Sequence, residues 1–231
     1  MELYQRSQTE TSAQNDPMAK ELLRRAFDMT SRWGKDFPGF TAALTVNENG
    51  TESKGQVTIK SPKDVEVKVV TSAQDPAAAE ELQKWLQNQV AMMAIHRAPR
   101  SFEDADGKYA LTLGPEDHHP MGRQVIIHGD GMNSRYRIAD DRIRQISRSM
   151  GPMKFTINIE EVMATSDGKF LTTEYVVFYF SPDDKLSNVE SFTDRPFELK
   201  GTYLPGTRRV ISSEKGAVVV RTLEFTGHRF L

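Results

Sequence analysis

The sequence predicts an α+β fold in which a large curved antiparallel sheet of about 11 strands forms a half-barrel with two amphipathic helices on its concave face. Two segments begin with Asp-Pro and then repeat apolar residues every three or four positions, as amphipathic helices do. From Ser101 onward, almost every apolar segment is short and is bounded by Gly, Pro, Asn or Asp. Short connections favour antiparallel neighbours, and so wide a sheet curls rather than stays flat.

The first helix is expected over Pro17–Trp33, because Asp16 can cap its N-terminus and Pro17 suits the first helical position. Phe40–Val46 and Gly55–Lys60 then predict a hairpin that turns through Asn49-Gly50. The second helix is expected over Asp75–Arg97. Its apolar stripe consists of Leu82, Trp85, Leu86, Val90 and Met93.

The later strands include Phe170–Phe180, Phe197–Leu204 and Arg208–Ser212. Within the first of these, Tyr175–Phe180 does not alternate between apolar and polar residues, so this strand is expected near the centre of the sheet with both faces covered. One interpretation is ordinary core, between a helix and a loop. The other is that part of this surface lines a cavity for an apolar molecule. The candidate ligand-binding residues are Trp85, Met93, Phe155, Ile157, Tyr175 and Phe178.

An arginine-rich hairpin is the most unusual local pattern. With Asp140-Asp141 as the turn, Arg137 should face Arg144 and Ile138 should face Ile143. Like charges directly opposite each other invite a counter-charge, either from acidic side chains of this protein or from an anionic head group or an acidic partner. The candidate anion-binding or partner-binding residues are Arg135, Arg137, Arg142 and Arg144.

Composition and motifs exclude several classes of function. The 231 residues include 30 Lys and Arg, 32 Asp and Glu and no Cys, for a net charge of −2. There is therefore no disulfide or thiol nucleophile, and no global attraction for nucleic acid. The adjacent His118 and His119 would point to opposite faces of an extended chain, so no metal site is predicted. No cofactor motif is present, and His96 and Tyr136 are weak candidates for proton transfer in an enzyme.

The polar residues 1–16 predict a disordered N-terminal tail, and residues 17–231 predict a single half-barrel domain. The tail lacks the apolar segment of a signal peptide, and no apolar stretch is long enough to span a membrane. We therefore expect a cytoplasmic protein, with peripheral association with a membrane as an extension of that expectation.

Several motifs together resemble a functionally uncharacterised family of roughly this length from cyanobacteria and plastid-bearing organisms. They include Phe37-Pro38-Gly39-Phe40-Thr41, Arg97-x-x-Arg100-Ser101-Phe102, the run Gln145–Asn158 and Tyr203-Leu204-Pro205. More remotely, the order of helix, hairpin, helix and long meander is similar to the lipoprotein-carrier half-barrel superfamily. The members of that superfamily hold acyl chains between a curved sheet and helices.

The leading expectation is a non-enzymatic binding protein that holds a lipid, isoprenoid or pigment between the sheet and the second helix. The alternative is an interaction or assembly factor that binds an acidic partner through the arginine-rich hairpin.

Overall fold

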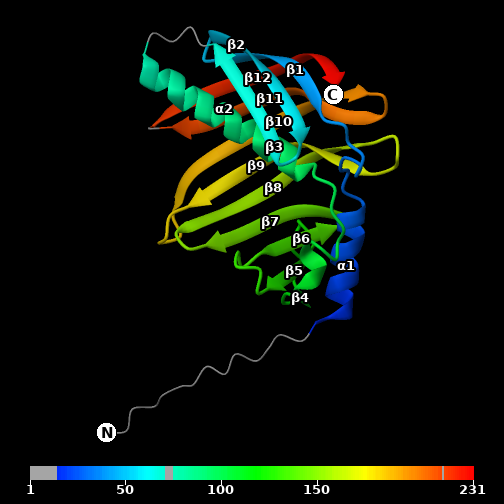
Figure 1. Ribbon diagram of the computed structural model, residues 1–231. Helices are drawn as coiled ribbons and strands as arrows, with labels where there is room; N and C mark the ends of the chain where they lie inside the picture. Colours follow the sequence, from blue (N-terminus) through cyan, green and yellow to red (C-terminus); the bar gives the residue numbers. More distant parts are fainter. Residues whose placement is uncertain (1–14, 71–74, 215) are drawn as a thin grey trace.

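Over residues 15–70, 75–214 and 216–231, the computed structural model contains two α-helices, one short 3-10 helix and a sheet of 12 strands (Figure 1). The helices are α1 (Pro17–Asp28), α2 (Pro76–His96) and η1 (Asp106–Lys108). The strands are β1 (Phe40–Glu48), β2 (Thr51–Ser61), β3 (Asp64–Val70), β4 (Ala110–Leu113), β5 (Arg123–His128), β6 (Arg135–Ala139), β7 (Arg142–Met150), β8 (Met153–Ala164), β9 (Phe170–Phe180), β10 (Leu186–Leu199), β11 (Thr202–Glu214) and β12 (Ala217–Phe230).

The strands form one open, curved sheet in the order β3-β2-β1-β12-β11-β10-β9-β8-β7-β6-β5-β4 (Figure 1). Every neighbouring pair is antiparallel. The chain follows a meander, except that β1 pairs with β12 and that α2 with the segment after it leads from the edge strand β3 to the opposite edge strand β4. The predicted fold class is confirmed, with 12 strands in place of about 11.

Helix α1 covers the end of the sheet that contains β4–β7. The Asp16 carboxylate accepts hydrogen bonds from the backbone N–H groups of Met18 (2.8 Å) and Ala19 (3.4 Å), as an N-cap does. Leu23 and Phe27 are buried among apolar residues of β4, β5 and β6. The helix ends at Asp28 rather than at Trp33 as expected, because the backbone of the next residues bonds with Phe170 instead of continuing the helix.

Helix α2 covers the other end of the sheet. It begins after the N-cap Asp75 and buries Leu86 and Val90 against β1, β2 and β12. Gln83 and Gln87 bond with backbone groups of the edge strand β3 at 2.7 to 3.1 Å. These amides satisfy backbone groups that an edge strand would otherwise expose.

Both helices lie on the same face of the sheet, as the strand register demonstrates. Residues paired across strands share a face. A continuous series of such pairs leads across the sheet from the core under α2 to the core under α1. In order, the pairs are Val46–Leu223, Leu223–Arg208, Val210–Phe192, Phe192–Tyr175, Val177–Ile157, Ile157–Ile146 and Ile146–Tyr136. This is the concave face.

Two further expectations concern one of the later strands and the N-terminal tail. The strand expected over Phe197–Leu204 is wrong, because Lys200 (φ 48°) and Gly201 (φ 77°) form the turn between β10 and β11. Both strands extend beyond the expected limits, past Pro196 and Pro205, which face each other at a register irregularity. Residues 1–14 of the expected tail lie outside the described residues, whereas the backbone N–H of Asp16 donates to the Leu111 carbonyl at 2.7 Å.

Candidate functional site

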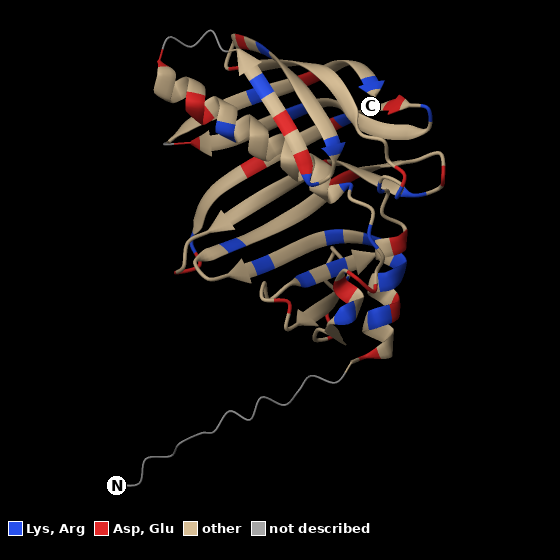
Figure 2. Ribbon diagram, in the orientation of Figure 1, with Lys and Arg blue, Asp and Glu red and all other residues tan. Residues whose placement is uncertain are grey.

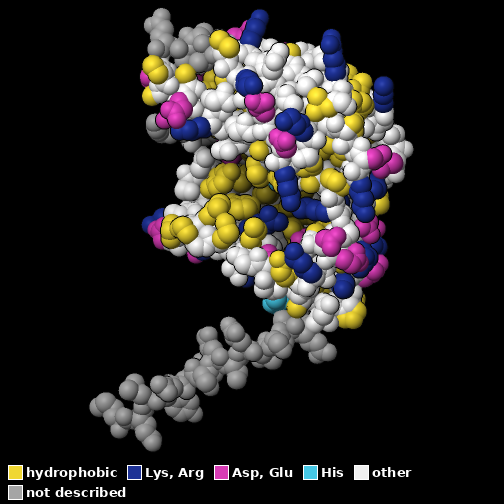
Figure 3. Space-filling model, in the orientation of Figure 1, with side chains coloured by type: hydrophobic (Ala, Val, Ile, Leu, Met, Phe, Trp, Pro, Cys, Tyr) yellow, Lys and Arg dark blue, Asp and Glu magenta, His cyan; other side chains and the backbone are white. Residues whose placement is uncertain are grey.

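A hollow lies between the two helix-covered ends of the concave face. Figure 3 shows that its wall is mainly hydrophobic, with Lys or Arg side chains at one end. Val177, Phe192 and Val210 form the buried base of this central section. The partly buried residues packed on this base are Trp85, Phe155, Ile157, Tyr175 and Tyr179. We call these five residues the groove residues.

Strand β9 is central, as predicted, but its two faces are not fully covered. Between Thr172 and Phe180, Val177 is buried and the other residues remain partly exposed. Helix α2 contributes Trp85 to the groove, whereas most of its apolar stripe packs against β1, β2 and β12. Part of the aromatic surface of the concave face is therefore accessible to a ligand.

The structure brings together four of the six residues expected to bind a lipophilic ligand. Trp85, Phe155, Ile157 and Tyr175 are groove residues. Met93 is 7% exposed and belongs to the core beneath α2. Phe178 follows the inward-facing Val177, so it lies on the convex face, where it pairs with Thr156 and Val189.

A buried ion pair anchors the base of the groove. Arg208 donates two hydrogen bonds to Asp194, at 2.8 and 2.7 Å, and a third to Gln89 of α2 at 3.1 Å. Although burial opposes the charged form, Tyr175 and Asp194 raise the pKa of Arg208. Burial raises the pKa of Tyr175 to about 12, and its ring stacks on Phe192 with a centroid distance of 4.5 Å.

The α2 wall of the groove is held by a second charged cluster. The Arg221 guanidinium lies 4.6 Å from the centroid of the Trp85 ring. It also forms ion pairs with Glu48 and Glu214. This arrangement fixes the Trp85 ring beside the apolar centre of the sheet and neutralises Arg221.

Four arginines gather at the end of the groove where the chain leaves α2, and we call Arg32, Arg97, Arg100 and Arg148 the groove arginines. The guanidinium groups of Arg32 and Arg100 lie 3.8 and 5.7 Å from the centroid of the same Phe27 ring. Arg148 pairs with Phe155 on the concave face and donates a hydrogen bond to the Tyr136 hydroxyl at 3.0 Å. The buried Nε atoms of Arg32 and Arg148 have no hydrogen-bond partner within the described part of the chain.

Desolvation and neighbouring positive charges lower three pKa values at this end of the groove. His96 is exposed to solvent, yet desolvation within the hollow and the nearby Arg208, Arg100, Arg148 and Arg97 lower its pKa to about 4. Burial lowers the pKa of Arg97 to about 10, and burial together with Arg100 lowers that of Arg32 to about 10. The guanidinium groups that surround His96 give the C-terminal end of α2 a positive potential.

Sequence reasoning missed all four groove arginines as site residues. Arg97 and Arg100 lie in irregular chain after a helix, where no periodicity assigns a face. Arg32 follows the last residues of α1. The spacing Arg97-x-x-Arg100 indicates a family resemblance, but it does not reveal that these side chains lie beside the centre of the sheet.

The arginine-rich hairpin places three of its four candidate arginines on the convex face of the sheet. Lys and Arg positions recur along β6–β8 and on α1 (Figure 2). Asp140 and Asp141 do form the turn, with φ of 52° and 53°, and Ile138 does face Ile143. The expected pairing of Arg137 with Arg144 is wrong, because Arg137 faces Gln145 and Arg144 is the extra residue at a register irregularity.

Arg135, Arg137 and Arg142 share the convex face, opposite to Tyr136 and Ile138. Arg137 forms two hydrogen bonds with Asp117, at 3.1 and 2.9 Å, and Arg142 lies 3.6 Å from Asp140. Two of these charges therefore have counter-charges within the protein. Arg135 is exposed, and binding of an acidic partner or an anionic head group at this face stays a prediction.

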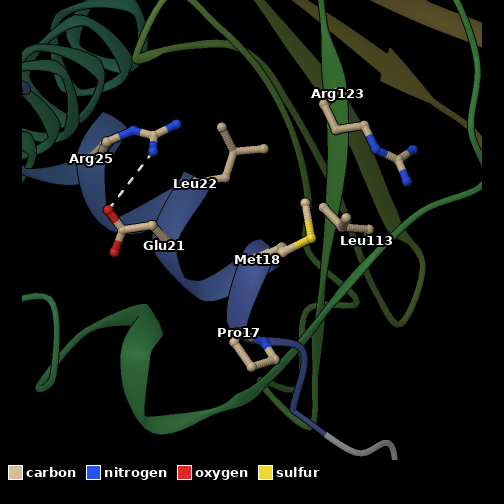
Figure 4. Close-up of a pocket in the computed structure, with 7 residues that line it drawn as sticks. All are labelled: Pro17, Met18, Glu21, Leu22, Arg25, Leu113 and Arg123. Atoms are coloured by element: carbon tan, nitrogen blue, oxygen red, sulfur yellow. Dashed lines mark ion pairs between the residues drawn. The ribbon is translucent and has the colours of Figure 1, made fainter.

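Two further surface pockets lie outside the groove. One, of about 290 Å³, is lined by polar residues of α2 that include Gln83 and Gln87. The other, of about 460 Å³, lies between α1 and the edge strand β4 and has Met18, Leu22 and Leu113 as its apolar lining (Figure 4). At its rim, Arg25 bonds with Asp141 at 2.9 Å and pairs with Glu21.

Within residues 15–70, 75–214 and 216–231, no group of three or more His, Asp or Glu side chains is placed to hold a metal ion. Neither α1 nor α2 is long and apolar enough to cross a lipid bilayer.

The fold and the groove define an α+β protein with an open, curved antiparallel sheet and two helices on its concave face. The chain belongs to a family described as "Protein of unknown function (DUF3386)", whose model matches residues 14–231. No curated protein matches the chain.

Two solved structures are similar over most of the chain. One is described as an outer membrane lipoprotein-sorting protein domain from Vibrio parahaemolyticus, with 9% identity, 92% of each chain covered and a TM-score of 0.38. The other is a DUF1329 family protein from Desulfovibrio piger, with 12% identity, 92% of each chain covered and a TM-score of 0.33.

Proposed function

We propose that this protein is a non-enzymatic binding protein that holds a lipophilic small molecule, such as a lipid, an isoprenoid or a pigment, in the groove. The observation that carries this proposal is the set of partly exposed aromatic and aliphatic side chains on the inner face of β8 and β9, beside Trp85 of α2. Concave apolar surfaces with a few polar groups are the usual sites for such ligands.

The two candidate groups for proton transfer, His96 and Tyr136, are poorly suited to that chemistry. His96, with a pKa of about 4, is a weak base at neutral pH. Burial raises the pKa of Tyr136, and its hydroxyl already accepts a hydrogen bond from Arg148. Neither group has the pKa near the working pH that general acid–base catalysis requires.

A matched pair of substitutions tests the proposal. Phe155 and Phe178 are both partly exposed and lie on adjacent strands, but Phe155 faces the groove and Phe178 faces the convex side. We expect Phe155→Ser to weaken binding of the uncharged fluorescent dye Nile red by about tenfold, since it removes an aromatic contact from the site. Phe178→Ser should leave binding of the dye unchanged.

The protein purified from its native host provides the second test. Native mass spectrometry followed by solvent extraction should detect a co-purified lipophilic molecule, and Phe155→Ser should reduce its amount. Equal dye binding by the two variants, together with an absence of any extracted molecule, would refute the proposal.

A further inference from the structure

We propose that the ligand of the groove is a lipid with a phosphate head group, which binds among the groove arginines while its chain lies on the groove residues. This inference rests on the proposed function and adds to it the chemistry of the head group. It is carried by the position of Arg32, Arg97, Arg100 and Arg148 at one end of the apolar hollow.

The groove arginines lie next to the apolar surface rather than on a separate face. Arg148 on β7 is the direct cross-strand partner of the groove residue Phe155, and both side chains lie on the concave face. Arg97 follows α2 directly and is close enough to Tyr175 and Asp194 to interact with them electrostatically. A molecule lying on Phe155 and Tyr175 would therefore have guanidinium groups beside it.

The groove arginines have N–H groups that form no hydrogen bond within the described chain. Arg100 is exposed, and its guanidinium contacts the Phe27 ring that Arg32 also contacts. Arg32 uses Nη1 to donate to the carbonyls of Phe27 and Thr30, and its buried Nε has no partner among the described residues. Arg148 uses Nη2 for Tyr136 and likewise leaves its buried Nε unpartnered within the described chain. Buried donors without a partner in the chain are satisfied by water or by a bound ligand. The Nε of Arg142 on the convex face is a third such atom among the described residues, and only the other two lie beside the apolar surface of the groove.

The charge count favours phosphate over carboxylate. Arg208 pairs with Asp194, which also acts electrostatically on Arg97. Asp106 interacts with Arg32, Arg100 and Arg148, and Asp28 interacts with Arg32. The groove arginines therefore exceed these two carboxylates by about two charges, which matches the charge of about −1.5 to −2 on a phosphate monoester. Guanidinium groups also bind phosphate oxygens through paired hydrogen bonds.

Four probes that separate the contribution of the chain from that of the head group test the inference. Dodecyl phosphate, dodecanoate and 1-dodecanoylglycerol share a 12-carbon chain, and inorganic phosphate carries the head group alone. Calorimetry below the micelle concentration should give dodecyl phosphate an affinity at least about tenfold higher than that of each other probe. Arg100→Gln and Arg97→Gln should each remove most of that advantage, whereas the convex-face variant Arg135→Gln should keep it.

The position of the head group has its own readout in the histidine beside it. An anion bound among the groove arginines should raise the pKa of His96, measured by proton NMR, and 1-dodecanoylglycerol should not. Thermal melting of each variant checks that it remains folded, and the His96 shift provides evidence from the unmodified protein.

The outcomes separate the two proposals. Equal affinity for dodecyl phosphate and 1-dodecanoylglycerol would overturn the phosphate inference and leave the lipophilic groove intact. Tighter binding of dodecanoate would overturn the choice of phosphate, and equally tight binding of inorganic phosphate would overturn the choice of a lipid. A loss of the advantage in Arg135→Gln would place the anion on the convex face and overturn the inference. Binding of none of the chain-bearing probes would refute the proposed function as well.

Discussion

Arg208 on β11 and Asp194 on β10 form a bidentate ion pair in which the two side chains are only 4% and 10% exposed. The two hydrogen bonds measure 2.8 and 2.7 Å, and Gln89 of α2 accepts a third from the same guanidinium. This pair ties two central strands and the helix together directly beneath the groove.

Removing one partner of this pair should be costly. Asp194→Asn keeps the size of the side chain but leaves the Arg208 charge buried without a counter-charge. We expect the free energy of unfolding to fall by about 3–5 kcal/mol. Urea denaturation measures this change. Arg209→Gln, which alters an exposed neighbour on β11, should change the same quantity by less than about 0.5 kcal/mol. A loss below about 1 kcal/mol in Asp194→Asn would contradict the structural role given to the pair.

The groove arginines should control the protonation of His96. NMR titration should place its pKa near 4, below the ordinary value of 6.5, because desolvation and the charges of Arg208, Arg100, Arg148 and Arg97 disfavour the imidazolium form. Arg100→Gln removes one of those charges and should raise the pKa. The convex-face variant Arg135→Gln is the control. Equal His96 pKa values in the two variants would count against a positive cluster at this end of the groove.

The same shift predicts how stability changes in acid. His96 binds its proton more weakly in the folded protein than in the unfolded chain, so its contribution is complete above pH 6.5 and is lost as the pH falls from 6.5 to about 4. His96→Gln removes this contribution. The drop in unfolding free energy between pH 7 and pH 4 should therefore be smaller in the variant, by roughly 1 kcal/mol because solvent screens an exposed group. Parallel stability curves for the two proteins would be inconsistent with this linkage.

Gly122 should tolerate a side chain worse than a comparable turn glycine. Its φ is +90°, and a Cβ there would lie 2.1 Å from the Ile138 carbonyl oxygen. Gly131 also has a positive φ, of +73°, but a Cβ there would meet nothing within 4 Å. We expect Gly131→Ala to cost about 1 kcal/mol from backbone strain and Gly122→Ala about 2–4 kcal/mol, because the β5–β6 pairing must also shift. Thermal denaturation can compare them, and equal costs would show that the close approach to Ile138 is relieved easily.

The alternation of side chains predicted most of the sheet because it reflects a local property, the two faces of a strand. The hairpin turns at Asn49-Gly50 and Asp140-Asp141 were predictable because their positive φ values suit those residues. The early end of α1 was not, since it depends on backbone bonds to Phe170, which lies far along the sequence. The turn at Lys200-Gly201 was missed because the apolar residues on either side read as one strand.

The site was harder to predict than the fold. Tyr175 and Phe178 lie in a run that is apolar on both faces, so alternation could not assign the concave face to one of them. The position of Arg144 depends on an irregularity in the β6–β7 register that no residue type reveals. The groove arginines come from three separate parts of the chain, and only the three-dimensional arrangement brings them together.

The pairing of β1 with β12 has a consequence for the order in which the protein folds. These strands are separated by most of the sequence, yet they are neighbours within the sheet. During synthesis, the β1–β3 hairpins and α2 emerge early, but β1 cannot pair with β12 until β12 has been synthesised. The β4–β11 meander can grow strand by strand in the meantime, through contacts between sequence neighbours. Joining the two parts of the sheet is thus a long-range step, which is intrinsically slow and leaves the edge of β1 open until β12 has been synthesised.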